Sequence, residues 1–222
     1  MSGNPDGKFP RILVPEVLDG LDANHPEAIR SRRDLRVIDV FLRGTVWIRN
    51  RTRREGELRR GGVVELGAGD GRLCRGLAAD ADGEPVTGLD LVPRPAGLPA
   101  TVQWRSGNFF ETLREVSGEI VVGSLILHHF EGAGLEALGR ELRRFRVMVF
   151  SEPWRSRCAL GLSALASPFA GRVTRHDMPA SIRAGFRRGE LAQFLLGGGE
   201  GWKIEESIWP CGALRFQAWR DI

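Results

Sequence analysis

The sequence predicts an α/β fold in which a mostly parallel sheet follows a helical N-terminal segment. From residue 62 onward, short apolar runs with few charges alternate with helix-like segments, which is typical of strand–helix–strand crossovers. Before that point, apolar residues recur three or four positions apart, as on one face of a helix. The 222 residues suffice for one full domain with an added subdomain.

The composition excludes several other classes of protein. With 42% hydrophobic and 27% charged residues, it indicates a soluble globular chain. No apolar stretch approaches the roughly 18 residues of a membrane helix, and the first residues, MSGNPDGKFPR, lack a signal peptide's apolar core. We therefore expect a cytoplasmic protein without a membrane span. Cys74, Cys158 and Cys211 match neither a disulfide framework nor a zinc cluster, so we expect buried, inert thiols and no metal.

We expect residues 1–60 to form an N-terminal helical cap and residues 61–222 to form the main domain. In the segment NHPEAI, Asn24 is a candidate N-cap and Pro26 falls in the first helical turn. The apolar stripe that follows consists of Leu35, Ile38, Leu42 and Val46. A glycine pair at 61–62 ends the cap.

The segment RNRTRREGELRR, 49–60, carries the densest positive charge. Arginines that neutralise phosphates could make it a nucleic-acid contact. The alternative is a solvated helix face and linker, because acidic residues are interspersed and no aromatic residues alternate with the arginines. We favour the second interpretation and regard nucleic acid as an unlikely partner.

The predicted strands and helices of the main domain follow in order. Apolar runs predict strands at 63–66, 86–89, 101–104, 120–126 and 146–151, and two terminal strands at 202–209 and 213–220. Helical patterns cover 156–166 and 181–196. Pro153 ends the fifth strand, and a turn at 210–212 joins the last two.

The stretch VVELGAGDG, 63–71, leads from the first strand into a glycine-rich turn and a helix. Such a turn lets backbone approach a nucleotide, and the helix N-terminus offers free N–H groups. A phosphate-binding P-loop needs a lysine, and none lies between residues 8 and 203. A dinucleotide fingerprint needs its last glycine where Arg72 stands, which disfavours NAD and FAD.

The remaining pattern, E-x-G-x-G-x-G, resembles the first motif of class I methyltransferases that use S-adenosylmethionine (SAM). Later segments match further motifs of these enzymes in the same order: TGLD (87–90), SGNFF (106–110), VVGSLILHHF (121–130), LRRFRVMVFSEP (142–153) and VTRHDMPASIRAGF (173–186). The fourth of these six motifs is similar to that of small-molecule enzymes, including the quinone-biosynthesis branch. The resemblance implies a Rossmann-like, seven-stranded, mostly parallel sheet with a reversed last strand.

The resemblance also implies a cofactor site for SAM and its product S-adenosylhomocysteine (SAH). At the methionine end of the cofactor, Glu65 would orient the amine and Ser124 would line the site. The turn beneath the amino acid and ribose would consist of Gly67, Ala68, Gly69 and Gly71, and Asp90 would hold the ribose. Leu91 would lie beside the adenine, which Asn108 and Phe109 would frame. Two features depart from the family pattern. Asn108 replaces an acid often found there, and residues 91–100 are too short and proline-rich for a full helix between the second and third strands.

The sulfonium of SAM is already activated, so the protein must align a nucleophile and remove its proton. The candidate bases are His128 and His129 after the fourth strand, and His176 between the fifth and sixth strands. Because neighbouring side chains of a strand point to opposite faces, we expect only one of the adjacent pair to face the site. The other is expected to be structural.

Residues 12–56 and 154–196 would roof an apolar pocket, which predicts methylation at oxygen or carbon of a small, aromatic or apolar metabolite. No Asp/Asn-Pro-Pro-aromatic motif follows the fourth strand, so methylation of an exocyclic base amine is disfavoured. The alternatives are an RNA methyltransferase that uses the basic segment, a SAM-binding module without catalysis, and an NAD-dependent dehydrogenase. The oligomeric state, monomer or homodimer, is open.

Overall fold

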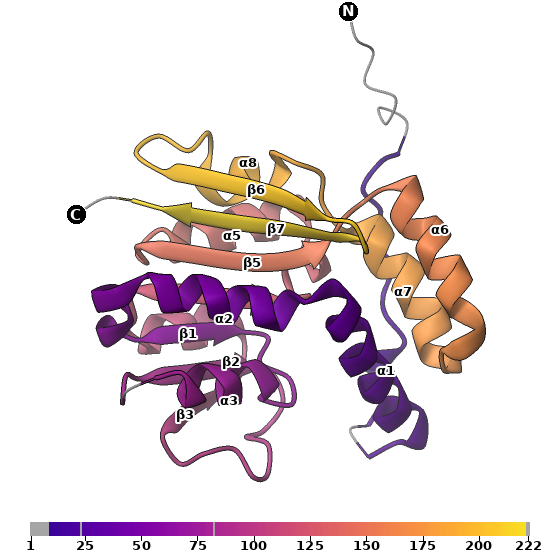
Figure 1. The fold of residues 1–222 in the computed structure, drawn as a ribbon, viewed down its shortest axis with the longest axis horizontal. Helices are drawn as coiled ribbons and strands as arrows, with labels where there is room; N and C mark the ends of the chain where they lie inside the picture. The colour runs from indigo at the N-terminus through magenta and orange to yellow at the C-terminus, as the bar shows by residue number, and fades with distance from the viewer. Residues whose placement is uncertain (1–8, 23, 82, 221–222) are drawn as a thin grey trace, which may run out of the picture.

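The computed structural model, which describes residues 9–22, 24–81 and 83–220, contains a seven-stranded sheet with helices on both faces (Figure 1). The strands are β1 (Val63–Leu66), β2 (Val86–Asp90), β3 (Val102–Ser106), β4 (Ile120–Ser124), β5 (Val147–Pro153), β6 (Lys203–Trp209) and β7 (Ala213–Trp219), in the order β3-β2-β1-β4-β5-β7-β6. Only β7 runs antiparallel to its neighbours, β5 and β6. The predicted sheet with a reversed last strand is confirmed.

The strand order reverses between β1 and β4, which pair in parallel from Val63↔Ile120 to Leu66↔Gly123. From β1 the chain moves outward to β2 and β3, and it then returns to the other side of β1. Ligands of open α/β sheets bind at the carboxyl ends of strands beside such a reversal. As predicted, no helix connects β2 and β3 within the described residues.

The helices fall into three groups, shown in Figure 1. They are α1 (Pro26–Leu42), α2 (Gly44–Arg54), α3 (Arg72–Ala79), α4 (Phe109–Thr112), α5 (Gly132–Leu142), α6 (Arg157–Ala166), α7 (Arg172–Ala184) and α8 (Glu190–Leu196), with 3₁₀ turns η1 (Leu18–Gly20), η2 (Gly56–Gly61), η3 (Leu113–Glu115), η4 (Leu127–His129) and η5 (Ser167–Phe169). α2 and α3 cover one face of the sheet, and α5 and α8 cover the other, where Phe109 of the short helix α4 also packs. α1, α6 and α7 lie together beyond the end of β5 (Figure 1).

Apolar side chains fill a layer on each face of the sheet. Phe150 of β5 packs on the α5 and α8 side, and its neighbour Val149 packs on the side of α2 and α3 with Ile48. All three are fully buried. Because both faces of the central strands are covered, those strands appear in the sequence as continuous apolar runs.

Three local predictions differ from the structure. The helix expected at 181–196 is two helices, because the chain is extended at Gly185, where an added Cβ would lie 2.2 Å from the Pro153 carbonyl oxygen. The N-cap of α1 is His25 rather than Asn24, and its Nδ1 accepts a hydrogen bond from the Glu27 N–H at 3.2 Å. Of the cysteines, only Cys74 is buried; Cys158 and Cys211 are exposed, because both lie near the open end of the sheet with α6.

Residues 1–8 of the expected cap lie outside the described residues. Helices α1 and α2 occupy most of the rest of it, and α2 packs directly on the sheet. In the part of the chain that the structure describes, no helix has the length and apolar character needed to cross a membrane.

Candidate active site

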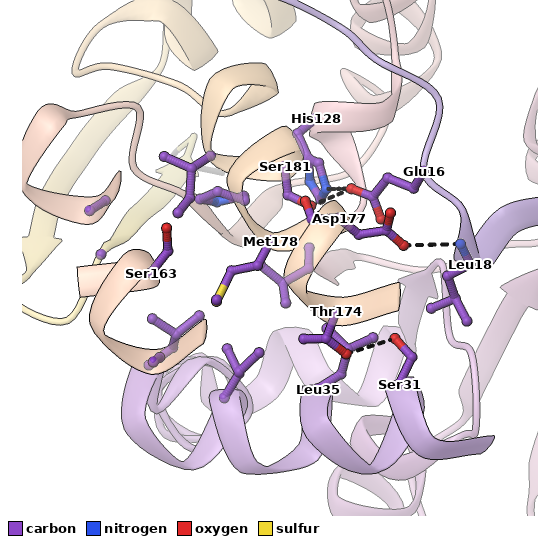
Figure 2. Close-up of a pocket in the computed structure, with 18 of the residues that line it drawn as sticks. Glu16, Leu18, Ser31, Leu35, His128, Ser163, Thr174, Asp177, Met178 and Ser181 are labelled. Atoms are coloured by element: carbon purple, nitrogen blue, oxygen red, sulfur yellow. Dashed lines mark hydrogen bonds and ion pairs between the residues drawn. The ribbon is translucent and has the colours of Figure 1, made fainter. Parts of the chain in front are cut away.

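A cavity of about 520 Å³ lies beyond the carboxyl ends of the central strands. Helices α1, α6 and α7 contribute nine apolar side chains to its lining: Leu35, Ile38, Phe41, Leu42, Ala159, Leu162, Ala166, Met178 and Ile182. Gly69 and Leu125 line it where β1 and β4 end. Its polar wall includes Glu16, Asp19, His128, His129 and Asp177. Figure 2 shows Met178 pointing into the cavity between α7 and α1.

The glycine turn after β1 adopts a backbone that glycine favours. Gly67, Gly69 and Gly71 have φ of 66°, 52° and 70°. An added Cβ at Gly67 would lie 2.6 Å from Ile126, and one at Gly71 would lie 2.8 Å from Leu98. At Gly69 nothing lies within 4 Å. The outer two glycines therefore permit close packing, whereas Gly69 borders open space that a ligand can fill.

Asp90, at the end of β2, supports this turn from beneath. Its carboxylate accepts hydrogen bonds from the N–H of Gly69 at 2.7 Å and from that of Val92 at 3.0 Å. Each carboxylate oxygen retains a further lone pair, so the group can still accept from ligand hydroxyls. The next residue, Leu91, is 75% exposed, and its place beside the adenine remains a prediction.

Glu65, on β1 two residues before the turn, is 3% exposed. Its Oε2 is a buried oxygen without a hydrogen-bond partner among the described residues. Burial raises the pKa of this carboxyl to about 8, although hydrogen bonds from the Cys74 thiol and backbone N–H act against the increase. A buried oxygen without a partner is costly. The site therefore fits a donor supplied by a ligand, such as an ammonium group.

The residues expected around the adenine have partners within the protein. The Asn108 Oδ1 accepts a hydrogen bond from the Phe110 N–H at 2.9 Å and caps α4. The Phe109 ring is buried, with its centroid 6.1 Å from that of Phe130. Ser124 ends β4 beside the start of α2, where an added Cβ on Gly44 would lie 3.2 Å from its Oγ. An adenine role for Asn108 and Phe109 and a methionine role for Ser124 remain predictions.

His128 is buried in η4 between two carboxylates. Its Nδ1 lies 2.9 Å from Glu152 Oε2, and its Nε2 lies 3.4 Å from Glu16 Oε1, as Figure 2 shows for the second contact. Burial alone would lower the pKa of this imidazole, but hydrogen bonds and the charges of Glu152 and Glu16 outweigh it and raise the pKa to about 9. His128 therefore carries a proton at neutral pH.

His129 lies next to His128, with ring centroids 4.3 Å apart, and its Nδ1 is 3.4 Å from Asp19 Oδ2. Both histidines line the same cavity. The expectation that only one of them faces the site is wrong, because β4 ends at Ser124 and the pair lies on a 3₁₀ turn instead of a strand.

His176, the third candidate base, lies elsewhere. Its side chain is 52% exposed and lines a second, smaller cavity with His25. Its neighbour Asp177 lines the main cavity and accepts hydrogen bonds from the N–H groups of Val17 (2.8 Å) and Leu18 (3.0 Å). Asp177 thereby fastens the N-terminal segment over the cavity.

Glu16 and Asp19 are site residues that the sequence analysis did not identify. Both come from the segment before α1, which has no helical or strand periodicity. The Ser181 hydroxyl donates a hydrogen bond to Glu16 Oε1 (Figure 2). One available signal was the segment LVPEVLDG, in which both acids stand among apolar residues.

Three arginines of the basic segment have partners within the fold. Arg49 donates two hydrogen bonds, at 2.7 and 2.8 Å, to the carboxylate of Asp80, which caps the C-terminus of α3. Arg51 contacts Glu205 of β6, and Arg59 donates to the backbone of Asp80 and Leu77. These contacts favour a role in packing over a role in binding nucleic acid.

Comparison with known proteins finds no matching family model and no matching curated protein. Solved structures do match. The plantazolicin methyltransferase BamL, in complex with a triazolic desmethylPZN analog and SAH, has a TM-score of 0.67 at 12% identity over 88% of this chain and 91% of that chain. Magnesium protoporphyrin IX methyltransferase (ChlM) from Synechocystis PCC 6803, with bound SAH, has a TM-score of 0.61 at 16% identity, covering 90% and 96%.

Human N-acetylserotonin methyltransferase, in complex with SAM, matches with a TM-score of 0.58 at 15% identity, over 92% of this chain and 61% of that chain. At such identities the likeness establishes the fold. The chain therefore has the class I methyltransferase fold, as the sequence predicted.

Proposed function

We propose that the protein is a SAM-dependent methyltransferase that methylates oxygen or carbon of a small, apolar or aromatic metabolite. The observation that carries this proposal is the largely apolar cavity that meets the glycine turn at Gly69 and has acid–base side chains in its wall. The similar solved structures, which contain SAH or SAM, support it through their shared fold.

The residues at the strand ends fit the cofactor. Gly69 leaves open space above the turn, and Glu65 offers an oxygen without a partner to the methionyl ammonium. Asp90 has lone pairs left for the ribose hydroxyls. SAM would supply an activated methyl group at this point.

The cavity favours an acceptor with apolar bulk and one polar group. Its volume of about 520 Å³ falls within the range of small-molecule sites. Side chains of α1, α6 and α7 would exclude water and hold the acceptor in line with the methyl group, and such alignment can supply on the order of 7–11 kcal/mol. Loss of the acceptor's proton would be promoted by the polar cluster of Glu16, His128 and His129.

The test is methyl transfer from labelled SAM to a panel of phenols and quinols, with RNA and a mixed protein sample in parallel. We expect turnover on one of the small aromatic compounds, and a rise in melting temperature with SAH but not with NADH. An absence of SAH binding at millimolar concentration, or methylation confined to RNA or protein, would contradict the proposal.

A further inference from the structure

Glu16, His128 and His129 form a polar cluster in the wall of an otherwise apolar cavity. Each offers one donor atom of the kind that binds metals, and these three atoms lie within 4.8 Å of one another. We propose that this cluster binds one divalent transition-metal ion through two imidazole nitrogens and one carboxylate oxygen.

The spacing of the first pair agrees with a shared ion. The distance from His128 Nε2 to Glu16 Oε1 is 3.4 Å. A direct charge-assisted hydrogen bond would be shorter, at about 2.7–2.9 Å. Two ligands of a tetrahedral ion, each bound at about 2.0–2.1 Å, are roughly 3.4 Å apart. The present contact, a long hydrogen bond between charged groups, therefore has a spacing that also suits two ligands of one ion.

The surroundings of His128 fix the imidazole in the orientation of a ligand. Glu152 is fully buried and accepts hydrogen bonds from the N–H groups of Ile126 and Leu127, both at 2.9 Å. This rigid carboxylate lies 2.9 Å from His128 Nδ1. With Nδ1 facing Glu152, the ring presents Nε2 to Glu16, so Nε2 is the nitrogen placed to bind an ion. Metal-bound histidines commonly have such a carboxylate behind them.

The negative charge around the cluster also favours a bound cation. Carboxylates of Glu16, Glu152 and Asp19 surround two imidazoles in a wall that is partly buried. Uncompensated negative charge at such a position is costly.

The donor set indicates which ions fit. Two imidazoles and one carboxylate suit Zn²⁺, Fe²⁺, Mn²⁺ or Co²⁺ better than Ca²⁺ or Mg²⁺, which prefer oxygen ligands only. Three protein ligands leave positions open toward the cavity. There the ion would bind an acceptor oxygen and ease the loss of its proton. That use rests on the proposed function, whereas binding of the ion does not.

The test is titration of untagged, full-length, metal-free protein with Co²⁺ in the absence of any methyl donor. We expect one Co²⁺ per chain and visible absorption bands with the intensity typical of four- or five-coordinate cobalt. The variants His129→Asn and Glu16→Gln should each weaken Co²⁺ binding by about tenfold or more. His25→Asn is the matched control, because it removes a histidine outside the cluster and retains a side chain that can cap α1.

Three results would overturn the proposal: no stoichiometric Co²⁺ binding, equal affinity in wild type and both cluster variants, or an equal loss in His25→Asn. Circular dichroism of each variant identifies any that fails to fold. Because the His129 side chain is partly exposed to solvent, His129→Asn is the cluster variant with the smaller risk of misfolding. A protein that binds Co²⁺ but methylates no small molecule would refute the proposed function alone.

Discussion

SAH binding should release a proton from Glu65. In the free protein this buried carboxyl has a pKa of about 8, so it is largely protonated at pH 6 and pH 7. Pairing with the SAH ammonium requires the ionised form. Ionising Glu65 costs about 3 kcal/mol at pH 6 and about half of that at pH 7, at 1.36 kcal/mol per pH unit. The association constant should therefore rise close to tenfold between these two pH values.

The raised pKa of Glu65 also determines the direction in which the stability of the protein changes with pH. The folded-state pKa of Glu65 is raised above its ordinary value of 4.5, so the folded protein binds the extra proton between about pH 5 and pH 8. This contribution to the stability of the unliganded protein is fully present below pH 4.5 and is lost as the pH rises through 8. Glu65→Gln, which has no proton to lose, should remove this part of the pH dependence.

Calorimetry of SAH binding in two buffers with different ionisation enthalpies measures the released proton directly. Wild type should release close to one proton at pH 6, and Glu65→Gln should release none while binding SAH more weakly at pH 8. Glu55→Gln is the matched control, because burial also raises the pKa of Glu55, which lies at the end of α2 and accepts a hydrogen bond from Gln217 of β7. A wild-type affinity that does not change with pH, or proton release that persists in Glu65→Gln, would refute this reasoning.

Three further perturbations test other parts of the structure. Gly67→Ala should destabilise the fold by at least about 1–2 kcal/mol in thermal melts, since the left-handed backbone and the close Ile126 side chain both oppose a Cβ; an unchanged melting temperature would contradict the packing described. Met178→Trp should fill the cavity, lowering kcat/KM for the acceptor while SAH affinity stays constant, and a parallel loss of SAH affinity would argue against separate subsites. Asp177→Asn should weaken its bonds to Val17 and speed hydrogen exchange at that amide, with unchanged exchange as the contrary result.

The fold followed from the sequence because its determining residues act locally. Central strands such as β4 are buried on both faces, so an apolar run was enough to locate them. The glycine turn needs its backbone conformation at Gly67, Gly69 and Gly71, and few other residues tolerate it. By contrast, the break between α7 and α8 depends on the approach of Gly185 to the Pro153 carbonyl, a contact between distant segments.

The polar cluster of Glu16, His128 and His129 could be predicted only in part, because it also depends on contacts between distant segments. The fourth-strand motif located His128 and His129 correctly at the end of β4. Their chemistry, however, depends on Glu16 and Asp19, which reach them from a segment without secondary-structure periodicity. His176 does contact Asp177, with Nδ1 2.9 Å from Oδ1, but the half-exposed imidazole lines the second, smaller cavity and only the carboxylate lines the main one.

The basic segment shows that a charge count along the sequence does not identify the partners of the charged side chains. Its arginines were compared with acidic residues nearby in the chain, whereas their actual partners are Asp80, after the first crossover helix, and Glu205, near the C-terminus. Arg49 joins α2 to α3, and Arg51 joins α2 to the far edge of the sheet. Arg49, Arg51 and Arg59 would have to break these contacts before they could neutralise a phosphate, so RNA binding through them would weaken the attachment of α2 to the rest of the fold. That cost, more than the absence of a motif, argues that the arginines serve to attach the N-terminal helices.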